Sequence, residues 1–323
     1  MKEYGGYIEF ENYSGFLFHD KAIALNCGRN ALAYIIEAKN IKKLYIPYFI
    51  CSSVVDVCKK NGVDIQFYNI NKKFEPVFCK KLNDEEYIYV VNYYGQLDNE
   101  CILRLKEKWE RIVVDNSQSF YNKPLDSIDT LYTCRKFFGV SDGAYLYTNK
   151  KIKRKLPIDQ SYDRMKYLMG RYERTANEFY MDYVSNNKMF NSEPIKGMSK
   201  LTKNILRSLD YDNIAKKRQN NFNMYNKKLE TINKLKLKSV YGAFMYPLLI
   251  KQGKLIRRKL QEMNIYIPTL WPDVLERCSE EALEYNYAEN ILPLPVDQRY
   301  DIKDIEYIIS KILNEINTYQ NYD

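Results

Sequence analysis

Short apolar runs alternate with amphipathic segments over residues 22–118. The runs are rich in β-branched and aromatic side chains, as strands are, and several segments between them place apolar residues three or four positions apart, as helices do. This alternation predicts right-handed βαβ units and a largely parallel sheet covered on both faces. The expected strands lie within residues 22–26, 42–47, 64–70, 87–95 and 111–118, and the expected helices within 28–40, 51–62 and 99–110.

The order of elements changes in the next part of the chain. Residues 129–134 and 143–149 have the pattern of two strands joined by a short turn, so we expect at least one of them to run antiparallel to its neighbours. From about 158 to 235 the pattern is helical, interrupted by a loop with Pro and Gly at 191–200. We therefore predict an α/β large domain of three layers, α/β/α, with a mostly parallel mixed sheet.

The last third of the chain predicts a small C-terminal α+β domain. A long amphipathic helix over residues 211–232 leads into it. Apolar segments follow at residues 243–251, 254–264, 265–272 and 301–319. We expect the large domain to span residues 1–205 and the small domain residues 206–323, with the long helix as the bridge between them.

Composition limits the classes of function. The chain has 46% hydrophobic and 28% charged residues with 12 glycines, which is typical of a soluble globular protein. The formal net charge of +9 comes from 50 basic and 41 acidic residues that are interleaved along the chain. Such diffuse charge disfavours a nucleic-acid interface and is compatible with a phosphorylated or nucleotide-linked small substrate.

The chain lacks the residues or segments that several other classes of protein need. No signal peptide or membrane span is recognisable, so we expect a cytoplasmic protein. The single histidine, His19, leaves almost no material for a His general base and excludes a His-rich metal site. No CxxC pair occurs among the cysteines, so we expect reduced thiols and neither a disulfide framework nor a metal site. The seven cysteines are Cys27, Cys51, Cys58, Cys79, Cys101, Cys134 and Cys278.

Three positions could carry chemistry together. Gly28 begins the first expected helix, where backbone N–H groups can hold a phosphate, although an ordinary turn explains it as well. Asp115 ends a buried strand, at the edge where open α/β sheets bind ligands, and a turn cap is the alternative. Lys136 follows an apolar strand, and lost hydration would lower its pKa and favour the free amine; the alternative is a surface lysine.

The combination resembles the DegT/StrS family of PLP-dependent sugar aminotransferases, which have the aspartate-aminotransferase fold type I. Gly28 at a helix start, the VVDNSQ motif and a lysine about twenty residues later before GVSDGAYLYTN carry the resemblance. It continues through YIPYFICSSVVDVCKKNGVDIQFYNI, VVNYYGQL, GMSKLTKNILRSLDYDNIAKKRQNN and LPLPVDQRYDIKDIEYII, in the order of the family. It covers about residues 22–312.

The resemblance implies roles for the candidate residues. Lys136 stands at the position of the lysine that forms a Schiff base with pyridoxal 5'-phosphate (PLP) and then moves protons. Asp115 matches the aspartate that pairs with the ring nitrogen of the cofactor, and Gln118 matches the glutamine beside the ring and its 3-hydroxyl. Gly28 and Arg29 match the turn that holds the cofactor phosphate.

Thr133 also matches a family feature, because it resembles a hydroxyl residue that binds the same phosphate in many fold type I enzymes. Two other positions depart from the family. Cys51 occupies the place of the ring that stacks on the cofactor, and two alternatives stay open: Tyr48 or Phe49 substitutes for that ring, or the stacking is lost. Ile195 occupies the place of an asparagine that the partner subunit donates to the phosphate, and the adjacent Lys196 is the nearest replacement.

The activity implied by the resemblance is transfer of an amino group from an amino acid, glutamate in the first instance, to a keto group of a nucleotide-linked sugar. The resemblance also implies a homodimer. Two alternatives stay open, namely another PLP reaction on this scaffold, such as a dehydratase or lyase, and a non-catalytic PLP- or sugar-binding homologue. Family members that dehydrate deoxysugars carry histidine in place of the lysine, and Lys136 argues against that branch.

Overall fold

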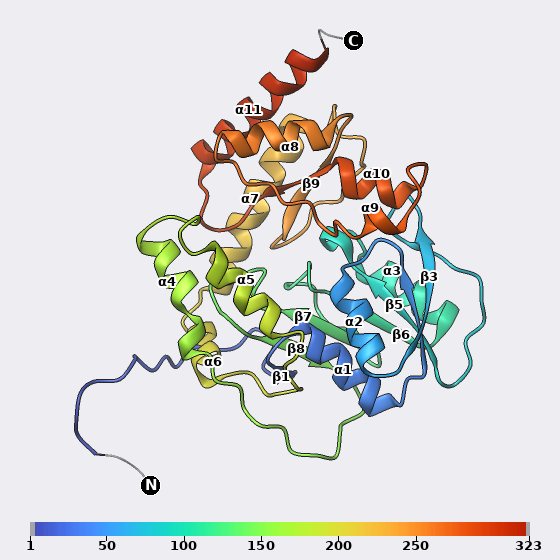
Figure 1. Ribbon diagram of the computed structural model, residues 1–323, viewed down its shortest axis with the longest axis vertical. Coiled ribbons are helices and arrows are strands. Elements are labelled where there is room, and N and C mark those ends of the chain that lie inside the picture. Colours follow the sequence, from blue (N-terminus) through green and yellow to red (C-terminus); the bar gives the residue numbers. More distant parts are fainter. Residues whose placement is uncertain (1–3, 321–323) are drawn as a thin grey trace.

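An eight-stranded mixed sheet forms the centre of the protein, and the computed structural model describes residues 4–320 (Figure 1). The order of its strands is β1-β8-β7-β6-β5-β2-β3-β4. The central pairs β7–β6, β6–β5, β5–β2 and β2–β3 are parallel, whereas β8 runs antiparallel to both β7 and β1. The strands are β1 (Ile23–Leu25), β2 (Lys43–Pro47), β3 (Asp64–Ile70), β4 (Pro76–Val77), β5 (Glu86–Val91), β6 (Ile112–Asp115), β7 (Asp129–Thr133) and β8 (Ala144–Tyr147).

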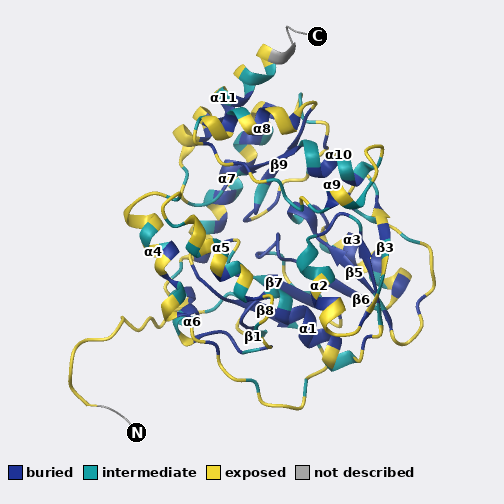
Figure 2. Ribbon diagram, in the orientation of Figure 1, coloured by how far each residue is buried: buried dark blue, intermediate teal, exposed yellow. Residues whose placement is uncertain are grey.

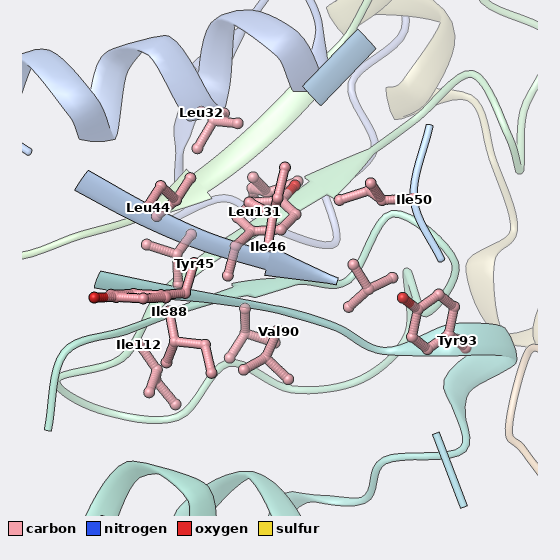
Figure 3. Packing of buried hydrophobic residues seen from close by; sticks show 14 of the residues in the cluster. Leu32, Leu44, Tyr45, Ile46, Ile50, Ile88, Val90, Tyr93, Ile112 and Leu131 are labelled. Atoms are coloured by element: carbon pink, nitrogen blue, oxygen red, sulfur yellow. The ribbon is translucent and has the colours of Figure 1, made fainter. Parts of the chain in front are cut away.

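Helices cover both faces of this sheet, which confirms the predicted three-layer α/β arrangement. Helices α1 and α2 contact each other on one face, and α1 packs against β1, β7 and β8. Helix α3 contacts β6, and Figure 3 shows the sheet between α1 and a helix on the opposite side. These helices are α1 (Gly28–Lys39), α2 (Ser52–Lys60) and α3 (Asn99–Trp109), with the 3-10 turn η1 (Tyr93–Gly95) between β5 and α3.

The core of the sheet follows from the apolar runs in the sequence. Leu44 and Ile46 of β2 and Leu131 of β7 lie on the face that Leu32 of α1 covers, whereas Ile88 of β5, opposite Tyr45, points to the other face (Figure 3). Each of these residues is at most 2% exposed. Parallel strands that are buried on both faces have continuous apolar sequences, which is why residues 22–118 were informative.

Helical segments follow β8, as the sequence predicted. They are the 3-10 turn η2 (Tyr162–Arg164), α4 (Lys166–Glu173), α5 (Tyr180–Met189), α6 (Lys200–Arg207) and α7 (Tyr211–Leu229). Between α5 and α6 the expected loop is present and forms only isolated bridges, through Gly197. In Figure 2 the sheet is the most deeply buried part of the molecule, and much of α4 and α5 is exposed.

A second, smaller sheet lies in the C-terminal part of the chain. Its two strands are antiparallel, and α7, α8 and α11 pack with them around a separate apolar core. The elements are β9 (Met245–Leu249), α8 (Gly253–Glu262), α9 (Val274–Arg277), α10 (Leu283–Asn290), β10 (Ile291–Pro295) and α11 (Ile302–Gln320). The long helix α7 connects this core to the large sheet, and the expected domain boundary at residues 205 and 206 remains a prediction.

Candidate functional site

The candidate residues gather where β6 and β7 end. Asp115 is the last residue of β6 and Thr133 the last residue of β7, and these parallel strands are neighbours with Asp115 opposite Leu131. The turn that follows β7 brings Lys136 back across the end of β6, where its Nζ donates a hydrogen bond to the Ser117 hydroxyl oxygen at 2.9 Å. Two of the predicted site residues, 21 positions apart in sequence, are thus joined through one serine.

The Lys136 amine is accessible but poorly hydrated. Its side chain reaches solvent, yet protein surrounds it on most sides, and the lost hydration lowers the pKa of Lys136. The nearby Asp115 and Cys51 side chains act in the opposite direction and raise the pKa of Lys136. The positive charges of Arg135 and Arg29 lower the pKa further. Lys136 is therefore neutral more often than an ordinary surface lysine and is open to a ligand.

Asp115 is held by two hydrogen bonds. Its carboxylate accepts one from the Tyr89 hydroxyl at 2.8 Å and one from the backbone N–H of Ser117 at 2.7 Å. Asp115 is 8% exposed, and Tyr89 is fully buried in β5. A buried carboxylate with two fixed donors keeps its orientation and has remaining lone pairs for a further cationic or N–H partner.

The start of α1 lies against the end of β7. Gly28 is the first residue of α1, and a Cβ at this position would lie 2.7 Å from Thr133 Cγ2. The hydroxyl of Thr133 donates to the backbone oxygen of Ser117 at 3.3 Å. A helix N-terminus attracts anions through its backbone N–H groups and dipole, and glycine lets a ligand approach closely.

Two arginines next to this helix start lack an acidic partner. Arg29 donates to the backbone oxygen of Asn187 at 3.1 Å, and Arg135 donates to the side-chain oxygen of the same residue. The Nε atoms of both arginines are buried and have no hydrogen-bond partner in the part of the chain that the structure describes. Within residues 4–320 neither guanidinium forms a salt bridge, so this pair of cations is suited to an anion.

The turn that carries Lys136 is fixed from the C-terminal side of the molecule. The backbone oxygen of Phe137 accepts hydrogen bonds from Arg218 Nη2 at 2.9 Å and from Gln298 Nε2 at 3.0 Å. Arg218 lies in α7 and is 1% exposed, and burial lowers its pKa to about 10. The bridging helix therefore holds the backbone next to the lysine.

The other predicted site residues do not all lie in the same surroundings. Gln118 is buried, and its Oε1 accepts from the backbone N–H of Tyr94 at 2.8 Å. Cys51, just before α2, lies near enough to influence the pKa of Lys136. Tyr48 instead stacks on Phe67 of β3, with ring centroids 4.9 Å apart, on a strand farther from β6.

The two positions expected near the phosphate from the loop before α6 are occupied in other ways. Ile195 is 7% exposed and belongs to the main apolar core. The ammonium of Lys196 forms salt bridges with Asp159, at 3.7 Å, and with Glu193. Because the resemblance assigns this loop to the phosphate of the partner subunit, its expected role stays a prediction.

Sequence reasoning missed Arg135 and Ser117 as parts of the site. Arg135 directly precedes the lysine, and that adjacency was the available signal for a second cation. Ser117 lies between two predicted residues, Asp115 and Gln118, but a turn serine carries no distinctive pattern. Among residues 4–320 no group of three or more His, Cys, Asp or Glu side chains could hold a metal ion. No helix in that range has both the length and the apolar character needed to cross a membrane.

Comparison with known proteins identifies the fold. No protein-family model and no curated protein sequence matches the chain. Solved structures do match, among them a DegT DnrJ EryC1 StrS aminotransferase from Brucella abortus, with a TM-score of 0.62 and 15% identity over 91% of this chain and 85% of that one. PseC from Helicobacter pylori, an aminotransferase of pseudoaminic acid biosynthesis, gives a TM-score of 0.61 and 13% identity over 92% and 87%.

A third match is relevant to the cofactor. The proposed sugar aminotransferase Spr1654 from Streptococcus pneumoniae, in its PMP form, gives a TM-score of 0.65 and 14% identity over 93% of this chain and 88% of that one. The same protein also matches in a PLP form. The chain therefore has the fold of DegT/StrS-type sugar aminotransferases, as its sequence motifs predicted.

Proposed function

We propose that this chain is a PLP-dependent aminotransferase that transfers an amino group from an amino acid to a keto group of a sugar. One observation carries the proposal. Lys136, Asp115 and the Arg29–Arg135 pair surround one edge of a sheet, each with the chemistry that one part of PLP requires. The fold shared with sugar aminotransferases supports the same activity.

The residues present fit the phosphate end of the cofactor. The guanidiniums of Arg29 and Arg135 have buried Nε atoms without hydrogen-bond partners in residues 4–320, and the start of α1 adds a positive dipole end. A Cβ at Gly28 would fill the space beside Thr133, so glycine keeps this cradle open. Arg135 would supply, within one chain, a phosphate contact in place of the amide that Ile195 lacks.

The residues also fit the reactive end. Bound PLP supplies an aldehyde that combines with amines and a ring that accepts electrons from the substrate carbon. Asp115, held by Tyr89 and Ser117, would accept the N–H of the ring nitrogen. Lys136 would take a proton from one carbon and return it to another, because its lowered pKa favours the neutral amine.

The finer parts of the proposal concern partners. We propose a nucleotide-linked keto-sugar as acceptor and glutamate as donor, since the interleaved net charge of +9 suits anionic substrates. We also propose a homodimer, in line with the sequence resemblance.

A second candidate function is PLP binding without transamination. The observation in its favour is that Cys51 stands where the family stacks a ring on the cofactor and that Tyr48 stacks on Phe67, so the usual stacking partner of the cofactor is altered. The ring centroid of Phe244 lies 5.6 Å from Lys136 Nζ, which leaves the cofactor an aromatic neighbour. We therefore favour the enzyme.

Nitrogen transfer separates these two functions. Purified protein is mixed with PLP, ¹⁵N-glutamate and a panel of keto-sugar nucleotides, and the label in the sugar is measured by mass spectrometry. We expect a yellow protein and a labelled amino sugar, with loss of both in Lys136→Ala and retention in the exposed-lysine control Lys123→Ala. A yellow protein that labels no sugar would support the binding function, and a colourless one would contradict both.

A further inference from the structure

We propose that Ser117 is a positioning residue for Lys136, whose hydroxyl holds the amine at the sheet edge in both of its protonation states. The inference deepens the proposed function and rests on it, because Lys136 must reach two carbons of a bound ligand in turn. It concerns a residue that neither the motif nor the spacing singled out.

Ser117 makes three hydrogen bonds to three different site residues. Its backbone N–H donates to Asp115 at 2.7 Å, and its backbone oxygen accepts from the Thr133 hydroxyl at 3.3 Å. Its side-chain oxygen accepts from Lys136 Nζ at 2.9 Å. Ser117 itself is 8% exposed, so the serine side of these contacts is buried, while the Lys136 side chain reaches solvent.

The two backbone contacts do not depend on the hydroxyl. The turn after β6 is also held by the backbone bonds Asn116 N to Leu131 O, at 2.8 Å, and Ser119 N to Asn116 O, at 2.9 Å. Replacing Ser117 by alanine therefore removes the contact to Lys136 and leaves the turn and the Asp115 contact in place. Among residues 4–320 the side-chain oxygen of Ser117 has no hydrogen-bond partner other than Lys136.

A hydroxyl suits an amine that changes its charge. It accepts a hydrogen bond from the ammonium form and can either accept from or donate to the neutral amine, so the contact survives proton transfer. A lysine side chain has about 2 kcal/mol of rotamer entropy, so a free amine would sample many positions. Holding Nζ near the reacting atoms reduces this search, as efficient proton transfer requires.

The serine contact also changes the balance between the two forms. A hydrogen bond to an ammonium is worth about 1.5–3 kcal/mol, partly offset by water when it is lost. Removal of the hydroxyl should therefore lower the pKa of Lys136 further, by about one unit. A purely structural role for Ser117 would produce no such shift.

Competitive acetylation tests the inference without the cofactor. The full-length chain is treated with trace acetic anhydride from pH 6 to pH 11, and mass spectrometry compares labelling of Lys136 with that of exposed Lys123. In Ser117→Ala we expect the Lys136 titration to move down by about one pH unit, with several-fold more labelling near pH 7. Ser117→Thr keeps a hydroxyl and should restore the wild-type curve. Ser119→Ala, a buried serine of the same turn whose hydroxyl has no bond to Lys136 among the described residues, should not change it.

A Ser117→Ala curve that coincides with the wild type would overturn the inference, and so would equal shifts in Ser117→Ala and Ser117→Thr. Because labelling needs no PLP, a protein that binds no PLP contradicts the proposed function alone. A protein that forms the Lys136 adduct but shows no shift in Ser117→Ala contradicts the role of Ser117 alone.

Discussion

The two faces of β7 use buried titratable side chains in opposite ways. Successive residues of a strand point to opposite faces, so Tyr132 and Thr133 belong to different environments. On the Tyr132 face lies His19, with ring centroids 4.2 Å apart. On the Thr133 face lie Gly28 and the Lys136 turn.

On the His19 face, both ring nitrogens of the histidine are hydrogen-bonded to uncharged groups. His19 Nε2 donates to the backbone oxygen of Phe120 at 2.9 Å, which leaves Nδ1 to accept from the Tyr147 hydroxyl at 3.1 Å. The histidine is 1% exposed, and burial lowers its pKa to about 4. The only histidine of the chain is therefore neutral and structural, although its residue type is the commonest in proton transfer.

On the Thr133 face, the positively charged side chains among the described residues are not all paired with negatively charged ones. Lys136, Arg29 and Arg135 lie together there, and the Asp115 carboxylate lies near Lys136. A folded protein tolerates such an excess of positive charge where an anionic ligand can neutralise it. The comparison teaches that unpartnered charge, more than residue type, distinguishes the site from the core.

The largest expected effect is on the chemistry of the Thr133 face. Asp115→Asn keeps the shape and removes the charge that, under the proposed function, would pair with the ring nitrogen of PLP, and breaking a buried pair costs about 3–5 kcal/mol. We expect kcat/KM for nitrogen transfer to fall by at least about a hundredfold, with little change in the melting temperature. Steady-state kinetics checks this, and His19→Gln should retain activity. A fully active Asp115→Asn would remove the carboxylate from the account.

A smaller effect is expected on the stability of the His19 face. Between pH 6.5 and about 4 the unfolded chain binds a proton at His19 that the folded protein does not, so stability falls as the pH is lowered through this window. The difference of about 2.5 units corresponds to about 3 kcal/mol. Urea unfolding at pH 7.5 and pH 4.5 should show a steeper loss for the wild type than for His19→Gln. Equal losses would mean that His19 is not buried in its neutral form.

The smallest effect is expected at the contact between α1 and β7. In Gly28→Ala the new methyl would meet Thr133 Cγ2 at 2.7 Å, and this overpacking should cost about 1–2 kcal/mol. It should also weaken PLP binding, since it narrows the cradle. Gly139→Ala is the control, because nothing lies within 4 Å of a Cβ at Gly139.

Adding Thr133→Ser to Gly28→Ala removes the obstructing methyl and keeps the hydroxyl, so the double variant should recover most of the lost stability and PLP affinity. Thermal unfolding and a PLP titration measure both. A double variant as impaired as Gly28→Ala would show that the steric contact is not the cause.

The sequence predicted the large sheet well because its central strands are buried on both faces. The antiparallel β8 was also predicted, since no helix separates it from β7. The small C-terminal domain was harder to predict from the sequence. Strand β10 contains Pro293 and Pro295, which strand patterns disfavour, and the apolar segment 265–272 forms no regular element, with Trp271 at a φ of 57°.

The carboxyl ends of parallel strands share one edge of a sheet, so the sequence was enough to place Asp115 next to the Lys136 turn. The sequence could not predict that Asn187 of α5, 52 residues after Arg135, binds both arginines, since this depends on tertiary packing. Nor could it predict that Tyr48 stacks on Phe67 of β3.

The central claim is that Lys136 is the amine that bonds to PLP. Protein loaded with PLP is reduced with borohydride and digested, and the pyridoxyl group is located by mass spectrometry. The account predicts one modified lysine, Lys136, in stoichiometric yield. A pyridoxyl group on another lysine, or spread over many of the surface lysines, would contradict it.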